Sequence, residues 1–180
     1  MTFYINGDKR EVYVDDYFPF NPATNDWAFS KAVGNELWVL LLEKAWAKIF
    51  GSYQRIESGN STEALIALTG AKVDFIFHEA EKHRQNAIYI KLKKADQLKY
   101  AIATAASSSR TGHTSRDMKN VGLVDAHAYS LLEVAEVPHG AGREKLLKIR
   151  NPWGFLEWKG AWSDGDEERW TPELKQRMGF

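Results

Sequence analysis

The stretch from Val121 to Asp164 constrains the fold most, because it combines two strand patterns with a turn between them. Leu123–Val137 is rich in Val, Leu and Tyr, and Lys145–Ile149 is a second run of strand-like residues. Between them, Pro138–Gly142 carries the proline and glycines that are typical of turns. Two such runs around a short turn predict an antiparallel β-hairpin.

One histidine and one asparagine lie symmetrically on this predicted hairpin. His127 and Asn151 are each 12 positions from His139. If the turn is centred on His139, the two side chains are cross-strand neighbours with Cβ atoms roughly 5 Å apart. Asn151 precedes Pro152, which favours an extended backbone, and Trp153 is large enough to cover a polar pair.

A histidine that is oriented by an asparagine amide is part of a Cys-His-Asn catalytic site. The asparagine oxygen accepts from one imidazole N–H, and the other ring nitrogen is left to face a thiol. The spacing alone favours a simpler interpretation, in which His127 is an ordinary sheet histidine and Asn151 begins a turn. The 180 residues include no cysteine, which excludes a disulfide, a cysteine-based zinc site and a thiol nucleophile within the chain.

Periodicity and capping residues predict further elements outside this hairpin. A short hairpin is expected around Asn6-Gly7. Helical spacing and capping residues predict two helices, at Asn35–Phe50 and Asn60–Thr69. A short apolar run predicts a strand at Val73–Phe77. Ser107–Asn120 is rich in Ser, Thr and Gly and predicts a mobile loop. Between these segments, helix propensity alone favours a helix from Ile88 to about Ala105.

Composition excludes several classes of protein. The chain is 44% hydrophobic with seven tryptophans, which is enough for a sizeable core in one domain or in a closely joined part of a larger one. Its formal net charge is zero, which gives no electrostatic argument for binding nucleic acid or a membrane surface. We expect no membrane span, because no apolar run approaches ~18 residues, and we expect no signal peptide at the N-terminus.

Two motifs together resemble the calpain family of cysteine proteases. DAHAYSL followed by IRNPWGFLEWKGAWSD is similar to the family's G-H-A-Y-S and I-R-N-P-W-G-x-x-E-W-x-G-x-W-S-D segments. NELWVLLLEKAWAKIFGSY also resembles a family segment. The resemblance implies an α+β fold, namely a papain-like cysteine protease subdomain of mostly antiparallel strands with a few helices. It also implies a helix that ends near Gln97 and a strand over Tyr100–Ala106. Residues 1–180 are then expected to be the second subdomain of a protease core, truncated so that the first subdomain with the cysteine is absent.

The resemblance also implies roles for individual residues. His127 and Asn151 match the catalytic histidine and asparagine, and Trp153 and Ala126 are expected in the substrate cleft. Ala126 departs from the family, which usually has glycine before the histidine. Glu157 and Asp164 match calcium ligands, although the remaining ligands are expected further downstream, so the site is expected to be incomplete. Without the resemblance, Asp164 and its acidic neighbours would be interpreted as a solvated surface run.

The expected function is part of a calcium-regulated, cytoplasmic cysteine endopeptidase. The chain would supply the histidine and asparagine, and the first half of the protease core would supply the cysteine as its partner. Substrates would be proteins or peptides, and the chain alone is expected to be inactive. Two alternatives remain: a catalytically dead calpain-like module that binds or scaffolds other proteins, and an unrelated β-rich binding domain.

Overall fold

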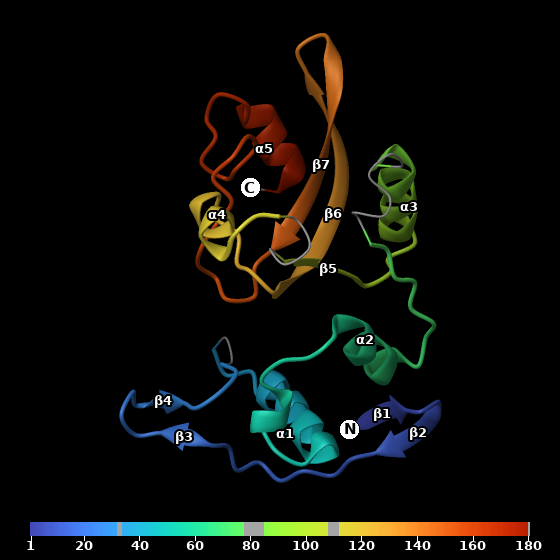
Figure 1. The fold of residues 1–180 in the computed structure, drawn as a ribbon, viewed down its shortest axis with the longest axis vertical. Coiled ribbons are helices and arrows are strands. Elements are labelled where there is room, and N and C mark those ends of the chain that lie inside the picture. Colours follow the sequence, from blue (N-terminus) through green and yellow to red (C-terminus); the bar gives the residue numbers. More distant parts are fainter. Residues whose placement is uncertain (32–33, 78–84, 108–111, 180) are drawn as a thin grey trace. The chain divides into compact units, whose positions relative to one another are not determined.

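The structure is a computed structural model that describes residues 1–31, 34–77, 85–107 and 112–179. The chain forms two compact units, Met1–Phe75 and Ile76–Phe180. Both contain helices and antiparallel strands, so the predicted α+β class is confirmed (Figure 1). The expectation that residues 1–180 form one subdomain of a larger core stays a prediction. Among the described residues, no helix has the length and apolar character needed to cross a membrane.

Two short hairpins lie in the first unit. Strands β1 (Thr2–Ile5) and β2 (Asp8–Glu11) pair around Asn6 and Gly7, whose φ angles are both positive. Two positive φ angles are typical of a two-residue hairpin turn, so this prediction is confirmed. Strands β3 (Phe20–Asn21) and β4 (Asp26–Trp27) form the second hairpin.

The two predicted helices of this unit are present. Helix α1 (Trp38–Phe50) begins after Leu37 rather than at Asn35, and a short 3-10 helix, η1 (Gln54–Ile56), follows it. Helix α2 (Ser61–Thr69) begins as predicted, because the Asn60 side chain accepts a hydrogen bond of 2.8 Å from Thr62 N–H. The strand predicted at Val73–Phe77 is wrong, since that segment forms no strand in the described structure.

Aromatic packing holds the core of the first unit. Phe3 is fully buried, and its ring lies 5.7 Å from that of Trp46 on α1. Trp46 also packs on Phe50, with 4.8 Å between ring centroids. Trp46 and Phe50 are therefore structural, whereas Trp38 at the start of α1 is 59% exposed.

A three-stranded antiparallel sheet forms the centre of the second unit. Its order is β5 (Ile102–Ala106), β6 (His127–His139) and β7 (Gly142–Arg150). Helix α3 (Gln85–Gln97) precedes the sheet. The end of α3 and the following strand are where the family resemblance placed them, and the longer helix favoured by propensity is wrong.

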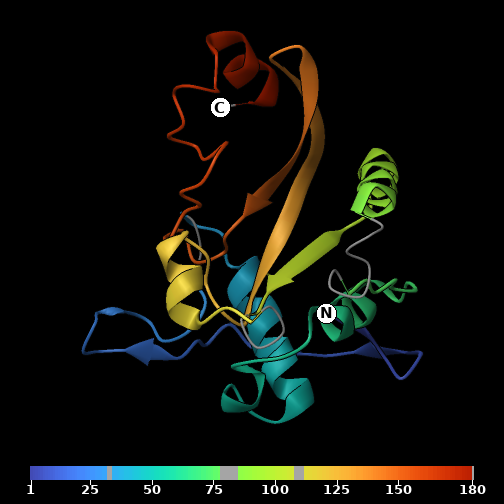
Figure 2. The same cartoon turned by 45° about the horizontal axis from the view of Figure 1, so that its top comes forward.

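The β6–β7 hairpin extends beyond β5 and has a helix on each side. Helix α5 (Pro172–Met178) begins at Thr171, whose side chain accepts from Leu174 N–H. Figures 1 and 2 show α5 and α3 on opposite sides of the hairpin. Buried side chains from β6, α5 and the preceding segment form the core beneath α5: Ala135, Val137, Trp170, Leu174 and Met178.

The segment before the hairpin contains a helix where the sequence predicts only a loop. Helix α4 (Ser115–Asn120) begins with a capping box, in which Thr114 and Asp117 each accept from the other's backbone N–H. The loop predicted over Ser107–Asn120 is therefore wrong at this helix. Positions 108–111 of that loop lie outside the described residues.

Candidate active site

The predicted histidine and asparagine meet at the end of the hairpin that is remote from its turn. His127 is the first residue of β6, and Asn151 follows the last residue of β7. His127 Nε2 lies 2.9 Å from Asn151 Oδ1. Asn151 is buried, and His127 is half-buried.

The hydrogen bonds of Asn151 determine which ring nitrogen of His127 carries the proton. Asn151 Nδ2 donates to the carbonyl oxygens of Phe155 (2.6 Å) and Leu156 (3.4 Å), and Oδ1 accepts from Trp153 N–H (3.1 Å). Carbonyl oxygens only accept, so the amide can be placed in only this orientation. Oδ1 therefore accepts from His127 Nε2–H, and Nδ1 becomes the basic nitrogen. Among the described residues, no hydrogen bond to Nδ1 is formed.

Aromatic rings surround the imidazole. The Trp153 ring centroid lies 4.4 Å from that of His127 with 50° between the planes. Tyr129 contacts His127 edge-on at 4.9 Å, and Tyr129 Oη accepts from Val124 N–H. Trp153 is 53% exposed, and it stacks on Phe155 at 5.5 Å. Trp153 thus covers the hydrogen-bonded pair on one side while it keeps a face open to solvent.

Ala126 lies directly before the histidine in an unusual backbone conformation. Its φ angle is +50°, in the left-handed region that glycine adopts readily. This conformation explains why glycine suits the position, and alanine there must tolerate strain. Ala126 is exposed next to His127, and its role in a substrate cleft stays a prediction, as does that of Trp153.

The two carboxylates predicted as calcium ligands do not form a metal site by themselves. Glu157 and Asp164 are both exposed. Calcium takes 6–8 oxygen ligands, but the described residues contain no group of three or more His, Asp or Glu side chains that could hold a metal. The described residues therefore supply at most part of a calcium site, and calcium binding stays a prediction from the resemblance.

Asp166 has a structural role, although it lies in the acidic run that the sequence without the resemblance would assign to a solvated surface. Its side chain is 9% exposed and accepts from Trp162 N–H (2.7 Å) and from the Arg169 guanidinium (3.0 Å). The hydrogen bond from Trp162 N–H, with help from Arg169, lowers the pKa of the Asp166 carboxyl. Asp166 therefore orders the loop that leads from the site region to α5. The Asp-x-x-Arg spacing is the one local signal for this role.

Comparison with known proteins identifies the family. The family described as calpain family cysteine protease matches residues 1–180. The chain is 36% identical to the calpain-type cysteine protease ADL1 of Oryza sativa subsp. japonica, covering 99% of this chain and 8% of that protein. It is 36% identical to calpain-8 of Rattus norvegicus (99% and 25%) and 35% identical to calpain-14 of Homo sapiens (92% and 23%).

The chain spans about a quarter or less of the length of these relatives. The match nevertheless extends over both units and includes the hairpin with His127 and Asn151. The papain-like α+β class expected from the motifs is therefore confirmed, and an unrelated β-rich domain is excluded. The chain belongs to the calpain family of cysteine proteases.

Proposed function

We propose that this chain supplies the histidine and asparagine of a calpain-like cysteine endopeptidase. The observation that carries the proposal is the hydrogen bond between His127 Nε2 and Asn151 Oδ1. It selects the tautomer in which Nδ1 is free to accept a proton. A thiol site needs this arrangement, because the imidazole must first take the proton of the nucleophile.

The reaction would be hydrolysis of a peptide bond in two stages. His127 Nδ1 would take the proton of a cysteine thiol, and the thiolate would attack the peptide carbonyl carbon. The imidazolium would then protonate the departing amine as the C–N bond breaks, which leaves a thioester on the cysteine. Water, deprotonated by the same nitrogen, would hydrolyse the thioester and restore the thiol.

The thiol for this reaction must come from outside the 180 residues, because the sequence contains no cysteine. We propose that the partner is the first half of a calpain protease core, and that the substrates are proteins or peptides. Asn151 would hold the imidazole plane throughout, because its amide has four hydrogen-bond contacts in total. Trp153 would keep water from the His127–Asn151 bond, since its ring lies against the imidazole.

Calcium regulation and a cytoplasmic location are also proposals that rest on the family resemblance. For calcium, Glu157 and Asp164 would contribute oxygen ligands, and further ligands would have to come from outside the described residues. No step of the proposed reaction depends on the ion.

A calpain-like module without catalysis is the second candidate function, because the 180 residues by themselves carry no thiol nucleophile. The intact His127–Asn151 pair favours the protease. A binding module gains nothing from a buried amide that fixes the tautomer of a half-exposed imidazole.

The two candidates differ in the activity of a chimera. The matching quarter of rat calpain-8 would be replaced by this chain, and peptide hydrolysis would be measured beside the chain alone. We expect the chimera to be active and the chain alone to be inactive. His127→Ala should reduce the rate of the chimera by about 10²-fold or more, because general acid–base catalysis contributes about that much.

His139→Ala is the matched control, since His139 is the exposed histidine at the other end of β6. It should leave the activity of the chimera unchanged. A folded but inactive chimera, or an active one that tolerates His127→Ala, would overturn the protease proposal and favour the binding module.

A further inference from the structure

The pairing of β6 with β7 changes register by one residue near its middle. From the turn to the bulge, the pairs run from His139↔Gly142 to Glu133↔Lys148. Beyond the bulge, the pairs are Leu131↔Ile149 and Ser130↔Arg150. Leu132 is the extra residue of this β-bulge, and its side chain is 41% exposed.

This bulge decides whether Asn151 and His127 share a face of the sheet. Side chains of directly opposed residues point to the same face, and a slip of one residue sends them to the other face. One position beyond Ser130↔Arg150, Asn151 falls opposite Tyr129, on the face that also carries His127. If the register near the turn continued without a bulge, Asn151 would fall opposite Ser130, on the face away from His127.

A carboxylate from α3 holds the strand at the bulge. Asp96 Oδ2 accepts from Val134 N–H at 3.0 Å, two residues after Leu132. The Asp96 side chain is 20% exposed, and its ion pair with Lys99 spans 3.8 Å to a side chain that is 85% exposed. A carboxylate in the last turn of a helix is also disfavoured by the helix dipole. Of these two contacts, the hydrogen bond from Val134 N–H on β6 is the one that explains why an aspartate is present at position 96.

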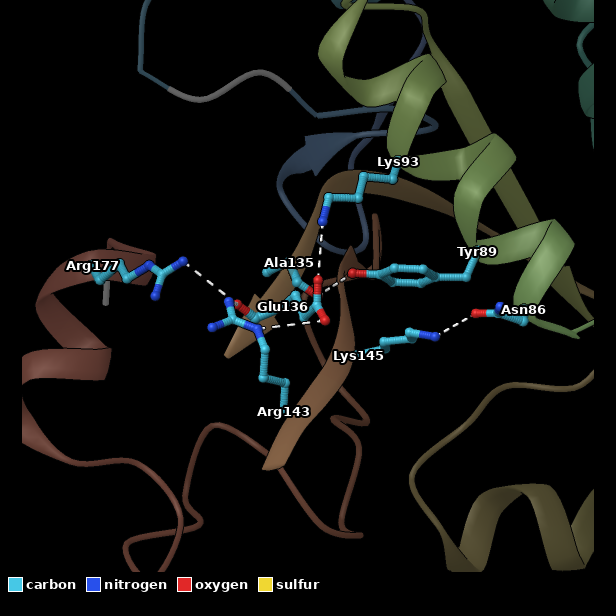
Figure 3. Close-up of polar contacts among 8 residues, drawn as sticks. All are labelled: Asn86, Tyr89, Lys93, Ala135, Glu136, Arg143, Lys145 and Arg177. Carbon is cyan, nitrogen blue, oxygen red and sulfur yellow. Dashed lines mark hydrogen bonds and ion pairs between the residues drawn. The ribbon is translucent and has the colours of Figure 1, made fainter. Parts of the chain in front are cut away.

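The rest of the same helix face keeps Asp96 against β6. Tyr89, Lys93 and Asp96 are spaced by four and three residues, which places them on one side of α3. Tyr89 Oη donates to Ala135 O at 2.8 Å, and Lys93 Nζ pairs with Glu136 at 3.1 Å, as Figure 3 shows. The Lys93 hydrogen bond also lowers the pKa of the Glu136 carboxyl, which keeps that carboxyl ionised.

We propose that Asp96 is a positioning residue, which acts through the bulge to keep Asn151 on the face of His127. Pairing with β5 fixes β6 from His127 to Leu131. Relative to that part of the strand, removal of the bulge would reverse the direction of the Val134 N–H. Asp96 therefore bonds to the bulged register and not to the slipped one. A contact that is made in only one of two states shifts the equilibrium toward that state. The inference rests on the proposed function, in which the His127–Asn151 pair is the working unit.

The test uses the full chain and nuclear magnetic resonance with two readouts. Cross-strand backbone proton contacts report the register, and the slowly exchanging His127 Nε2–H signal reports the bond to Asn151. Asp96→Ala should weaken the contact between Ser130 and Arg150, create one between Ser130 and Asn151, and remove the Nε2–H signal. Asp96→Asn retains an acceptor oxygen and should preserve both readouts.

Two further variants separate the bulge from general packing. Tyr89→Phe removes a bond between the same helix and the same strand, but it leaves the bulge contact intact, so both readouts should persist. Deletion of Leu132 leaves every observed β6–β7 pair in place with a regular ladder. In that deletion background, Asp96→Ala should no longer affect either readout.

The proposal is overturned if Asp96→Ala leaves the register and the Nε2–H signal unchanged. It is also overturned if the chain that combines Asp96→Ala with the deletion of Leu132 lacks the His127–Asn151 bond or fails to fold, because Asp96 would then act by another route. If Asp96→Ala alone does not fold, folding of this combined chain supports the proposal. Both readouts are independent of catalysis. A negative result for Asp96 can therefore be distinguished from a failure of the protease proposal, which would appear as an inactive chimera.

Discussion

Asn151 reaches His127 from one residue beyond the last pair of the β6–β7 ladder, with 2.9 Å between Oδ1 and Nε2. The two residues are diagonal neighbours rather than direct partners. Extended by the register of Ser130↔Arg150, the ladder places Trp153 opposite His127. Trp153 does pack on the imidazole, at 4.4 Å. One short segment after β7 therefore provides both the hydrogen bond to the histidine and its aromatic cover.

We predict that Ala126→Gly stabilises the chain. The φ angle of +50° costs an L-residue about 1–2 kcal/mol, while glycine costs roughly 0.5–1 kcal/mol in chain entropy. The free energy of unfolding in urea should therefore rise by about 1 kcal/mol or less. Ala128→Gly, in β6 and without a positive φ, is the control and should lose stability. A loss of stability in both variants would contradict the strain at Ala126.

Gly122→Ala should disrupt the loop that carries Glu157. Gly122 has a φ angle of +84°, and a Cβ atom there would lie 1.8 Å from the Glu157 carbonyl oxygen. Two backbone segments would have to separate, so we expect a loss of roughly 2 kcal/mol or more in the free energy of unfolding. Gly165→Ala meets nothing within 4 Å and serves as the control. Equal melting temperatures for both variants would refute this close contact.

Asp166→Asn should lower the melting temperature near neutral pH and make the melting temperature less dependent on pH in the acidic range. Because hydrogen bonds lower the pKa of Asp166 in the folded state, the ionised carboxyl stabilises the fold above its unfolded pKa of about 3.9. That contribution is lost as the pH falls through the lower, folded pKa. The melting temperature of the wild-type chain should thus approach that of Asp166→Asn as the pH decreases.

Melting curves across acidic pH check this prediction, with Glu167→Gln as the control at an exposed neighbouring carboxyl. If the melting temperatures of wild type and Asp166→Asn differ by the same amount at every pH, the charge of Asp166 does not contribute to stability.

Trp153→Ala should expose the His127–Asn151 bond to water with little loss of stability, because Trp153 is 53% exposed. We expect the Nε2–H proton of His127 to exchange severalfold faster with solvent. Trp158→Ala removes another partly exposed tryptophan from the same segment and should leave this exchange rate unchanged. Unchanged exchange in Trp153→Ala would mean that the indole does not shield the pair.

The hairpin could be predicted from the sequence, but its register could not. The turn lies at Gly140-Ala141, since His139 pairs with Gly142, and Pro138 is still part of β6. The assumed pairing of His127 with Asn151 is therefore wrong by two positions. A shift of two residues keeps a side chain on the same face, which is why the two residues still meet. No local pattern marked Leu132 as a bulge, because its cause is the contact with Asp96 on a separate helix.

Helices α4 and α5 were not predicted, although capping residues mark their ends. Thr114 and Asp117 form a capping box, and Thr171, Pro172 and Gly179 bracket α5. Both helices are short, so apolar periodicity was not evident, and α5 is stabilised by burial against β6. The opposite error occurred at Val73–Phe77. An apolar run suits a strand, but a strand also needs a partner, and a single sequence does not reveal one.

The most direct test of the account is the tautomer of His127 in the intact chain. The ¹⁵N shifts of the two ring nitrogens, assigned with His127→Gln, show which nitrogen is protonated when the imidazole is neutral. We predict protonation at Nε2, with a slowly exchanging proton that is lost in Asn151→Ala, and an unprotonated Nδ1. A proton on Nδ1, or a rapidly exchanging mixture that Asn151→Ala leaves unaltered, would contradict the claim that this chain holds a histidine ready to accept a thiol proton.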